Sequence, residues 1–224
     1  NGMAIELHRV SMDFLDEKNQ TYWNQLTQNA LCFEEKKLQI GEIKVPVFEA
    51  KYDLLFCFMH SWEHFCGTGI PLKQVCDTAL LLQRAKCKVY SEELNTYLET
   101  HLKALHMLEV WKSYGYMACK VLDLPHEEWP LGVDQKYGER LYRQVMSEGQ
   151  YRTKDYGESQ DRFVARERAK QMNVLSRKML TLKGRIDKAR FLYQFAPKHA
   201  CYILLQEIKK GIRRTVRREK MIDY

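Results

Sequence analysis

The chain has 224 residues, of which 45% are hydrophobic and 29% are charged. This balance is typical of a soluble globular protein, and the length suffices for one ordinary domain or two small ones. No apolar run is long enough to cross a bilayer and residues 1–30 show no signal-peptide core, so a cytoplasmic location is expected. The seven cysteines include no Cys-x-x-Cys pair. This excludes a disulfide framework or zinc knuckle and predicts reduced, mostly buried thiols.

The positive charge is concentrated in the C-terminal part of the chain. Residues 160–224 hold 18 Lys and Arg against 6 Asp and Glu, whereas the preceding part holds 18 against 23. Such an asymmetry is found in proteins that contact nucleic acids, nucleotides or anionic membranes. It is also found in long helices with a solvated charged face, so both interpretations stay open.

The first predicted element is a short strand over residues 4–10. Its residues alternate, which places Glu6 and His8 on the same side. Asn1-Gly2 lies directly before this strand and is a hairpin signal. It predicts a preceding strand, and therefore that the chain is the C-terminal portion of a longer protein.

A helix and a small hairpin are predicted next. Residues 12–30 have helical apolar spacing, with Asp13 or Asp16 near the start. Residues 31–49 have β character, with strands on either side of Gly41-Glu42. Pro46 is expected on an edge strand because it cannot donate a hydrogen bond to a neighbour.

The chain is organised around residues 53–82, which are predicted to form two apolar helices. Gly67, Gly69 and Pro71 provide the break between them. The apolar stripe of the first helix is Leu54, Leu55, Phe58, Met59, Trp62 and Phe65. The apolar face of the second is Leu72, Val75, Cys76, Ala79, Leu80 and Leu82. We expect the two helices to pack as a hairpin.

The remaining chain is predicted to be mostly helical. One helix begins at Ser91, which can cap it, and Gly184 is expected to end or weaken a later one. The predicted elements are helices over 88–124, a loop over 125–131, a helix over 134–148, a polar loop or boundary over 149–161, a helix over 162–190 and a basic helix over 197–220.

His60 and His64 are the first candidate functional residues. They are four residues apart, so on a helix they share one face and both could reach one metal ion. The segment HSWEH is not the zincin pattern, and Glu63 is expected to lie about 100° away from the pair. Histidines that hydrogen-bond within or beside the core are the alternative interpretation.

The apolar helix with His-x-x-x-His, the Gly-containing turn and the segment IPLKQVCDTALLL together resemble the helical part of an uncharacterised bacterial nucleotidyltransferase family. That family belongs to the polymerase-beta-like superfamily. The segment IELHR resembles the family's short strand ending in Glu/Asp-x-His. The resemblance is loosest after Leu124.

The resemblance implies a mainly α fold with a small β portion (α+β), a helical bundle attached to a remnant of a nucleotidyltransferase sheet. It divides the chain into a β-containing end over 1–50, a helical domain with the central hairpin over 51–124, and a basic helical extension over 125–224.

The resemblance also implies transfer of a nucleotidyl group from a nucleoside triphosphate to an unknown acceptor with Mg²⁺. Such an enzyme needs a Gly-Ser turn, an Asp-x-Asp/Glu pair and a third carboxylate. The chain contains no Gly-Ser dipeptide and no two acidic residues at i, i+2. Only Glu6 matches, as the third carboxylate and metal ligand, so this chain alone is expected to be inactive.

The residues implied in substrate contact are His8, His60, His64, Lys73 and Gln74. His8 could instead fill space, and Lys73 could be a solvated surface lysine. Arg213, Arg214, Arg217 and Arg218 are a further option for an anionic substrate.

The alternative function is a non-catalytic helical module that binds a protein or acidic polymer through the Arg-rich C-terminal helix. No stacking aromatic motif of an RNA-binding fold is present, so nucleic acid is not favoured as a partner.

Overall fold

The computed structural model describes residues 12, 14, 16–31, 37–67, 70, 72–88, 91–148, 173–198, 200, 201, 205, 208 and 209. The described chain is mainly helical with one small antiparallel sheet, which confirms the predicted fold class. Its elements are α1 (Glu17–Leu31), β1 (Lys37–Ile40), β2 (Ile43–Pro46), α2 (Ala50–Gly67), α3 (Leu72–Lys88), α4 (Ser91–Ala104), α5 (Leu108–Leu122), the 3₁₀ turn η1 (His126–Glu128), α6 (Gln135–Glu148) and α8 (Val174–Tyr193). The strand predicted over 4–10 and the loop predicted over 149–161 lie outside the described residues.

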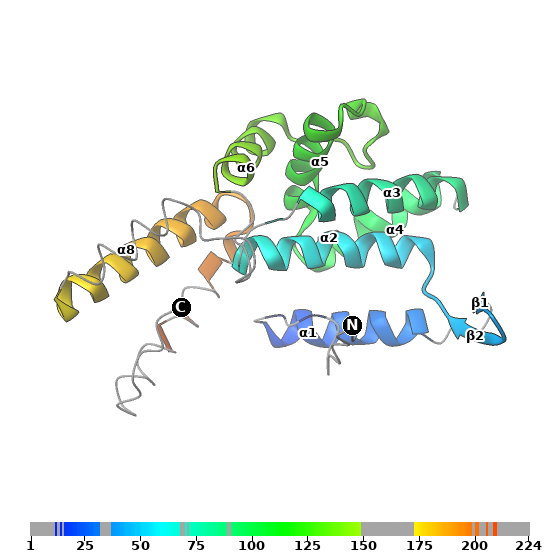
Figure 1. Ribbon diagram of the computed structural model, residues 1–224, viewed down its shortest axis with the longest axis horizontal. Coiled ribbons are helices and arrows are strands. Elements are labelled where there is room, and N and C mark those ends of the chain that lie inside the picture. The colour runs from blue at the N-terminus through cyan, green and yellow to red at the C-terminus, as the bar shows by residue number, and fades with distance from the viewer. Residues whose placement is uncertain are drawn as a thin grey trace.

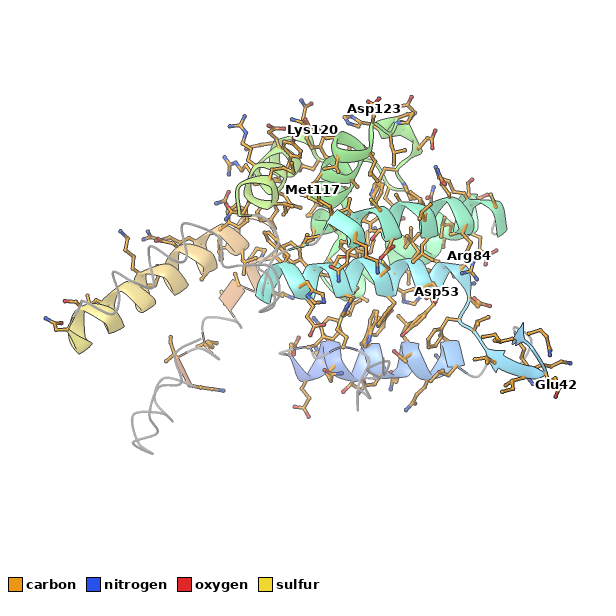
Figure 2. The ribbon with its side chains drawn as sticks, viewed as in Figure 1. Glu42, Asp53, Arg84, Met117, Lys120 and Asp123 are labelled. Carbon is orange, nitrogen blue, oxygen red and sulfur yellow. The ribbon has the colours of Figure 1, made fainter. Side chains whose placement is uncertain are left out.

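The predicted helical hairpin is confirmed by α2 and α3, which lie side by side (Figure 1). All six stripe residues of α2 are buried, and Leu54, Leu55 and Phe58 are fully so. Each such side chain contributes about 1.5–3 kcal/mol through removal from water. Arg84 on α3 reaches Asp53 on α2 at 3.7 Å, and Figure 2 shows the two side chains near the same end of the helix pair.

The predicted apolar face of α3 is partly wrong. Val75 and Leu82 are buried as expected, but Leu72 is 46% exposed and Leu80 is 63% exposed. On a helix, Leu80 is rotated about 140° from Val75 and about 160° from Leu82, since each residue adds about 100°. The prediction therefore assigned to one face apolar residues that point in different directions on the helix.

Most of the residues of α5 are buried. Val110, Trp111 and every residue from Ser113 to Cys119 are buried. The loop after α5 covers one side of this helix, where the Trp111 indole donates a 2.8 Å hydrogen bond to the Pro130 carbonyl. Gly115 is required here, since an added Cβ would overlap the Trp129 indole.

The β1–β2 hairpin has the predicted position and turn. Ile40 pairs with Ile43 across Gly41-Glu42, and Gly41 adopts a positive φ of 59° that favours glycine. Glu42 lies at the hairpin tip, which extends beyond the end of α2 (Figures 1 and 2). Ile40 and Ile43 are both exposed.

The described C-terminal part corrects one prediction. The helix predicted over 162–190 is described from Val174, where the Asn173 side chain accepts a hydrogen bond from the Ser176 N–H at 2.8 Å. It continues through Gly184 to Tyr193, so glycine neither ends nor interrupts it. A single glycine costs a helix only about 1 kcal/mol relative to alanine, which the flanking residues can offset.

The end of α8 and the residues that follow it pack against the rest of the molecule. Phe191 lies 6.0 Å from Phe65, and Phe195 lies 6.4 Å from Trp62, between ring centroids. Of the predicted final helix over 197–220, the described residues 197, 198, 200, 201, 205, 208 and 209 are helical. The four arginines proposed for an anionic substrate lie outside the described residues.

Candidate ligand site at the histidine end of α2

The predicted site residues divide into three groups. Glu6 and His8 lie outside the described residues. His60 and His64 lie on α2 and contact each other, with their Nε2 atoms 3.1 Å apart. Lys73 and Gln74 lie in the first turn of α3, where Lys73 is exposed and Gln74 is partly buried.

The two histidines end a series of aromatic rings along α2. Phe48, Tyr52, Phe56, His60 and His64 follow one another at intervals of four residues, and each ring contacts the next. The ring of His60 is stacked on Phe56, with an interplanar angle of 6° and a centroid distance of 5.9 Å. Residues four apart lie on one helix face, so the spacing brings the four rings of α2 together, and Phe48 packs on Tyr52 from the segment before the helix. The four-residue spacing of the rings begins at Phe48 in the sequence, but the prediction used only its last two members, His60 and His64.

The apolar part of the ring series is covered by α1. Trp23 is fully buried and packs against Tyr52 and Phe56. The Tyr52 hydroxyl also hydrogen-bonds with the Thr27 hydroxyl at 2.8 Å. The ring series therefore joins α1 to α2.

Glu63 is a further residue of the site, and the sequence did not single it out as one. Its Oε2 lies 3.8 Å from His60 Nδ1, on the side of the ring opposite the histidine pair. Residues at i, i+3 are neighbours on a helix, and this spacing was the signal that could have found Glu63. The side chains of His60 and Glu63 are 41% and 46% exposed, so both are open to a ligand.

The two histidine rings share a hydrogen bond between their Nε2 atoms. In the neutral pair, one Nε2–H donates to the other Nε2, which accepts with its lone pair. The Glu63 carboxylate, 3.8 Å away and beyond hydrogen-bond distance, favours a proton on His60 Nδ1 only through its charge, and this tautomer leaves His60 Nε2 as the acceptor. The pair can therefore donate to an anion or offer nitrogen lone pairs to a cation.

Gln74 belongs to a buried polar cluster that joins α3 to α5. Its backbone carbonyl accepts hydrogen bonds from the Thr78 hydroxyl at 2.8 Å and from the Tyr114 hydroxyl at 3.4 Å. Its side-chain Oε1 is buried without a hydrogen-bond partner. Burial raises the pKa of Tyr114, so the phenol stays protonated and donates. Gln74 thus has a structural role through its backbone.

The described residues form no group of three or more His, Cys, Asp or Glu side chains that could hold a metal ion. Glu6, the predicted Mg²⁺ ligand, lies outside the described residues. The described thiols also differ from the expectation of mostly buried cysteines, since among them only Cys119 is buried, while Cys87 and Cys201 are exposed. In the described part of the chain, no helix is both long and apolar enough to span a membrane.

A separate cavity of about 560 Å³ lies between the segment before α1, the α4–α5 turn and the residues after α8. Its wall is mostly apolar, with Phe14, Leu105 and Met107 among the lining residues. At its edge, Lys198 Nζ donates to His106 Nε2 at 2.8 Å. No local sequence pattern predicts this cavity, because its walls come from three distant segments.

Comparison with known proteins gives no match: no family model fits the chain, and no curated protein or solved structure is significantly similar to it.

Proposed function

We propose that this chain is the C-terminal helical portion of a metal-dependent, cytoplasmic nucleotidyltransferase, in which the histidine end of α2 contacts the triphosphate or the acceptor. The proposal rests on the resemblance of the α2–α3 hairpin to that family. One observation supports it: the half-exposed His60–His64 pair lies at the end of a helix that is otherwise largely buried.

The chemistry of the pair suits an anionic ligand. Imidazole changes its charge near neutral pH, so a phosphate oxygen can accept a hydrogen bond from a ring N–H and favour the protonated form. Lys73 in the first turn of α3 is exposed and could add a second positive charge. Glu6 and Mg²⁺ keep the catalytic roles that the resemblance implies.

The test is thermal unfolding of the chain with each nucleoside triphosphate and Mg²⁺. A ligand at 100 times its Kd adds about 2.7 kcal/mol to the free energy of unfolding. For a chain of this size, each kcal/mol raises the Tm by about 2–4 °C. We expect a rise of several degrees that is reduced in His60→Gln. The control is His126→Gln, because His126 is an exposed histidine on η1.

The second candidate is a non-catalytic module that binds an acidic polymer through the basic C-terminal residues. The excess of Lys and Arg over residues 160–224 favours it. Binding of this kind weakens steeply with salt and needs no Mg²⁺. Polyphosphate or heparin that raises the Tm at low salt, together with no response to any triphosphate, would favour this module over the nucleotidyltransferase.

A further inference from the structure

The Nε2 atoms of His60 and His64 are positioned like two ligands of a single metal ion. They lie 3.1 Å apart, and the ring planes are 88° to one another. Two imidazole nitrogens bound at about 2.0–2.1 Å to one tetrahedral ion are about 3.3 Å apart. Binding therefore requires the two nitrogens to move apart by about 0.2 Å and each ring to turn, so that its lone pair points at the ion and no longer at the other nitrogen.

The surroundings of His60 orient it for this role. Stacking on Phe56 restricts the ring, and Glu63 Oε2 lies 3.8 Å from Nδ1. Histidines that bind metals usually direct the other ring nitrogen to a carboxylate or carbonyl, which fixes the tautomer and leaves Nε2 for the ion. His64 reaches the same state when its proton moves from Nε2 to Nδ1, so its ring stays neutral.

We propose that His60 and His64 bind one divalent transition-metal ion of the zinc class through their Nε2 atoms, with Glu63 as a positioning residue. Imidazole is a preferred ligand of Zn²⁺, Ni²⁺ and Cu²⁺, whereas Mg²⁺ prefers oxygen ligands. The site is therefore distinct from the predicted Mg²⁺ site. The described residues place no third acidic, cysteine or histidine ligand with the pair, so the remaining coordination positions take water or an oxygen of a bound ligand.

The test is calorimetric titration of the EDTA-treated full chain with Zn²⁺ alone. We expect one ion per chain, with the affinity lowered about tenfold or more in His60→Gln and in His64→Gln. Glu63→Gln is expected to lower it about tenfold, because loss of an outer carboxylate typically costs 10–100-fold in metal affinity. His126→Gln is the matched control and should leave the affinity unchanged.

Two further measurements separate this site from thiol binding and from misfolding. Cys66→Ser should keep the affinity, since a thiol could otherwise account for zinc uptake. Metal-free thermal unfolding of each variant shows whether it is folded. With Co²⁺, the visible absorption of the bound ion should appear in the wild type and be lost in His60→Gln.

Three results would overturn the inference: no Zn²⁺ binding up to millimolar concentrations, binding that is retained in both histidine variants, or binding lost only in Cys66→Ser. The inference does not depend on the proposed function, because the Zn²⁺ titration contains no nucleotide. A chain that binds Zn²⁺ but no triphosphate would contradict the proposed function alone.

Discussion

The two halves of the ring series on α2 have the same spacing and the same helix face but different cover. Tyr52 and Phe56 pack beneath Trp23 of α1, whereas the side chain of His60 is 41% exposed. The first half consists of apolar rings that gain stability from burial, and the second half consists of imidazoles that remain accessible. The same helical repeat thus provides a structural contact at one end and a candidate ligand site at the other.

The largest effect is expected from Trp23→Ala, which removes the cover of the apolar half. Trp23 is fully buried, and such truncations cost about 3–5 kcal/mol because they leave a cavity. Urea unfolding measures the loss. Leu31→Ala is the control, because Leu31 lies on the same helix and is 56% exposed. Equal stabilities of the two variants would mean that α1 does not depend on this contact.

A smaller effect is expected from Tyr52→Phe. This change keeps the ring in place but removes the 2.8 Å hydrogen bond with Thr27. The expected cost is about 1 kcal/mol of the free energy of unfolding. A double-mutant cycle with Thr27→Val measures the coupling. A coupling energy near zero would show that the hydroxyl does not join α1 to α2.

A third histidine, His101 on α4, differs from the pair because rings from two helices cover it. The Tyr22 hydroxyl of α1 hydrogen-bonds with its Nδ1 at 2.7 Å, and Tyr97 packs on its ring at 4.2 Å. Burial, and then the charge of Lys51, lower the pKa of His101 in the folded chain below the ordinary value of 6.5.

The direction of the pH effect follows from this lowered pKa. The unfolded chain binds the proton at His101 more tightly, so the contribution to stability is complete above pH 6.5 and is lost as pH falls below it. His101→Gln should reduce this loss, measured by urea unfolding between pH 7.5 and about pH 5. His126→Gln should keep it. Stability that rises as pH falls through this window would contradict the lowered pKa.

The smallest effect on stability is expected from His64→Gln. The pair is half-exposed, and substitutions at such positions usually change the free energy of unfolding by no more than about 0.5 kcal/mol. A loss well above 1 kcal/mol in urea unfolding would identify the pair as structural, and the two halves of the ring series would then share one role.

Much of the fold could be predicted from sequence because local signals were strong. The stripe on α2, the break at Gly67, the start of α4 at Ser91 and the turn at Gly41-Glu42 all follow from helical or hairpin rules. The enclosure of α5 could not be predicted, because it depends on Trp129 and α6 folding back onto it. Gly184 failed as a helix end because its cost is small beside a helix of 20 residues.

The candidate site was only partly predictable. Helical spacing predicted the shared face of His60 and His64, and the structure confirms their contact. It also predicted Glu63 about 100° from the pair, which is compatible with the i, i+3 contact to His60 at 3.8 Å. The burial of Gln74 Oε1 depends on packing between α3 and its neighbours, which no local pattern encodes.

The most direct test of a ligand site at the histidine end of α2 is a side-chain ¹H–¹⁵N spectrum of the seven histidines during titration with ATP and Mg²⁺. We predict that the ring signals of His60 and His64 shift together and saturate, while those of His101 and His126 stay in place. Saturable shifts at other histidines with none at His60 and His64, or no shift at any histidine, would contradict a nucleotide site at this end of α2.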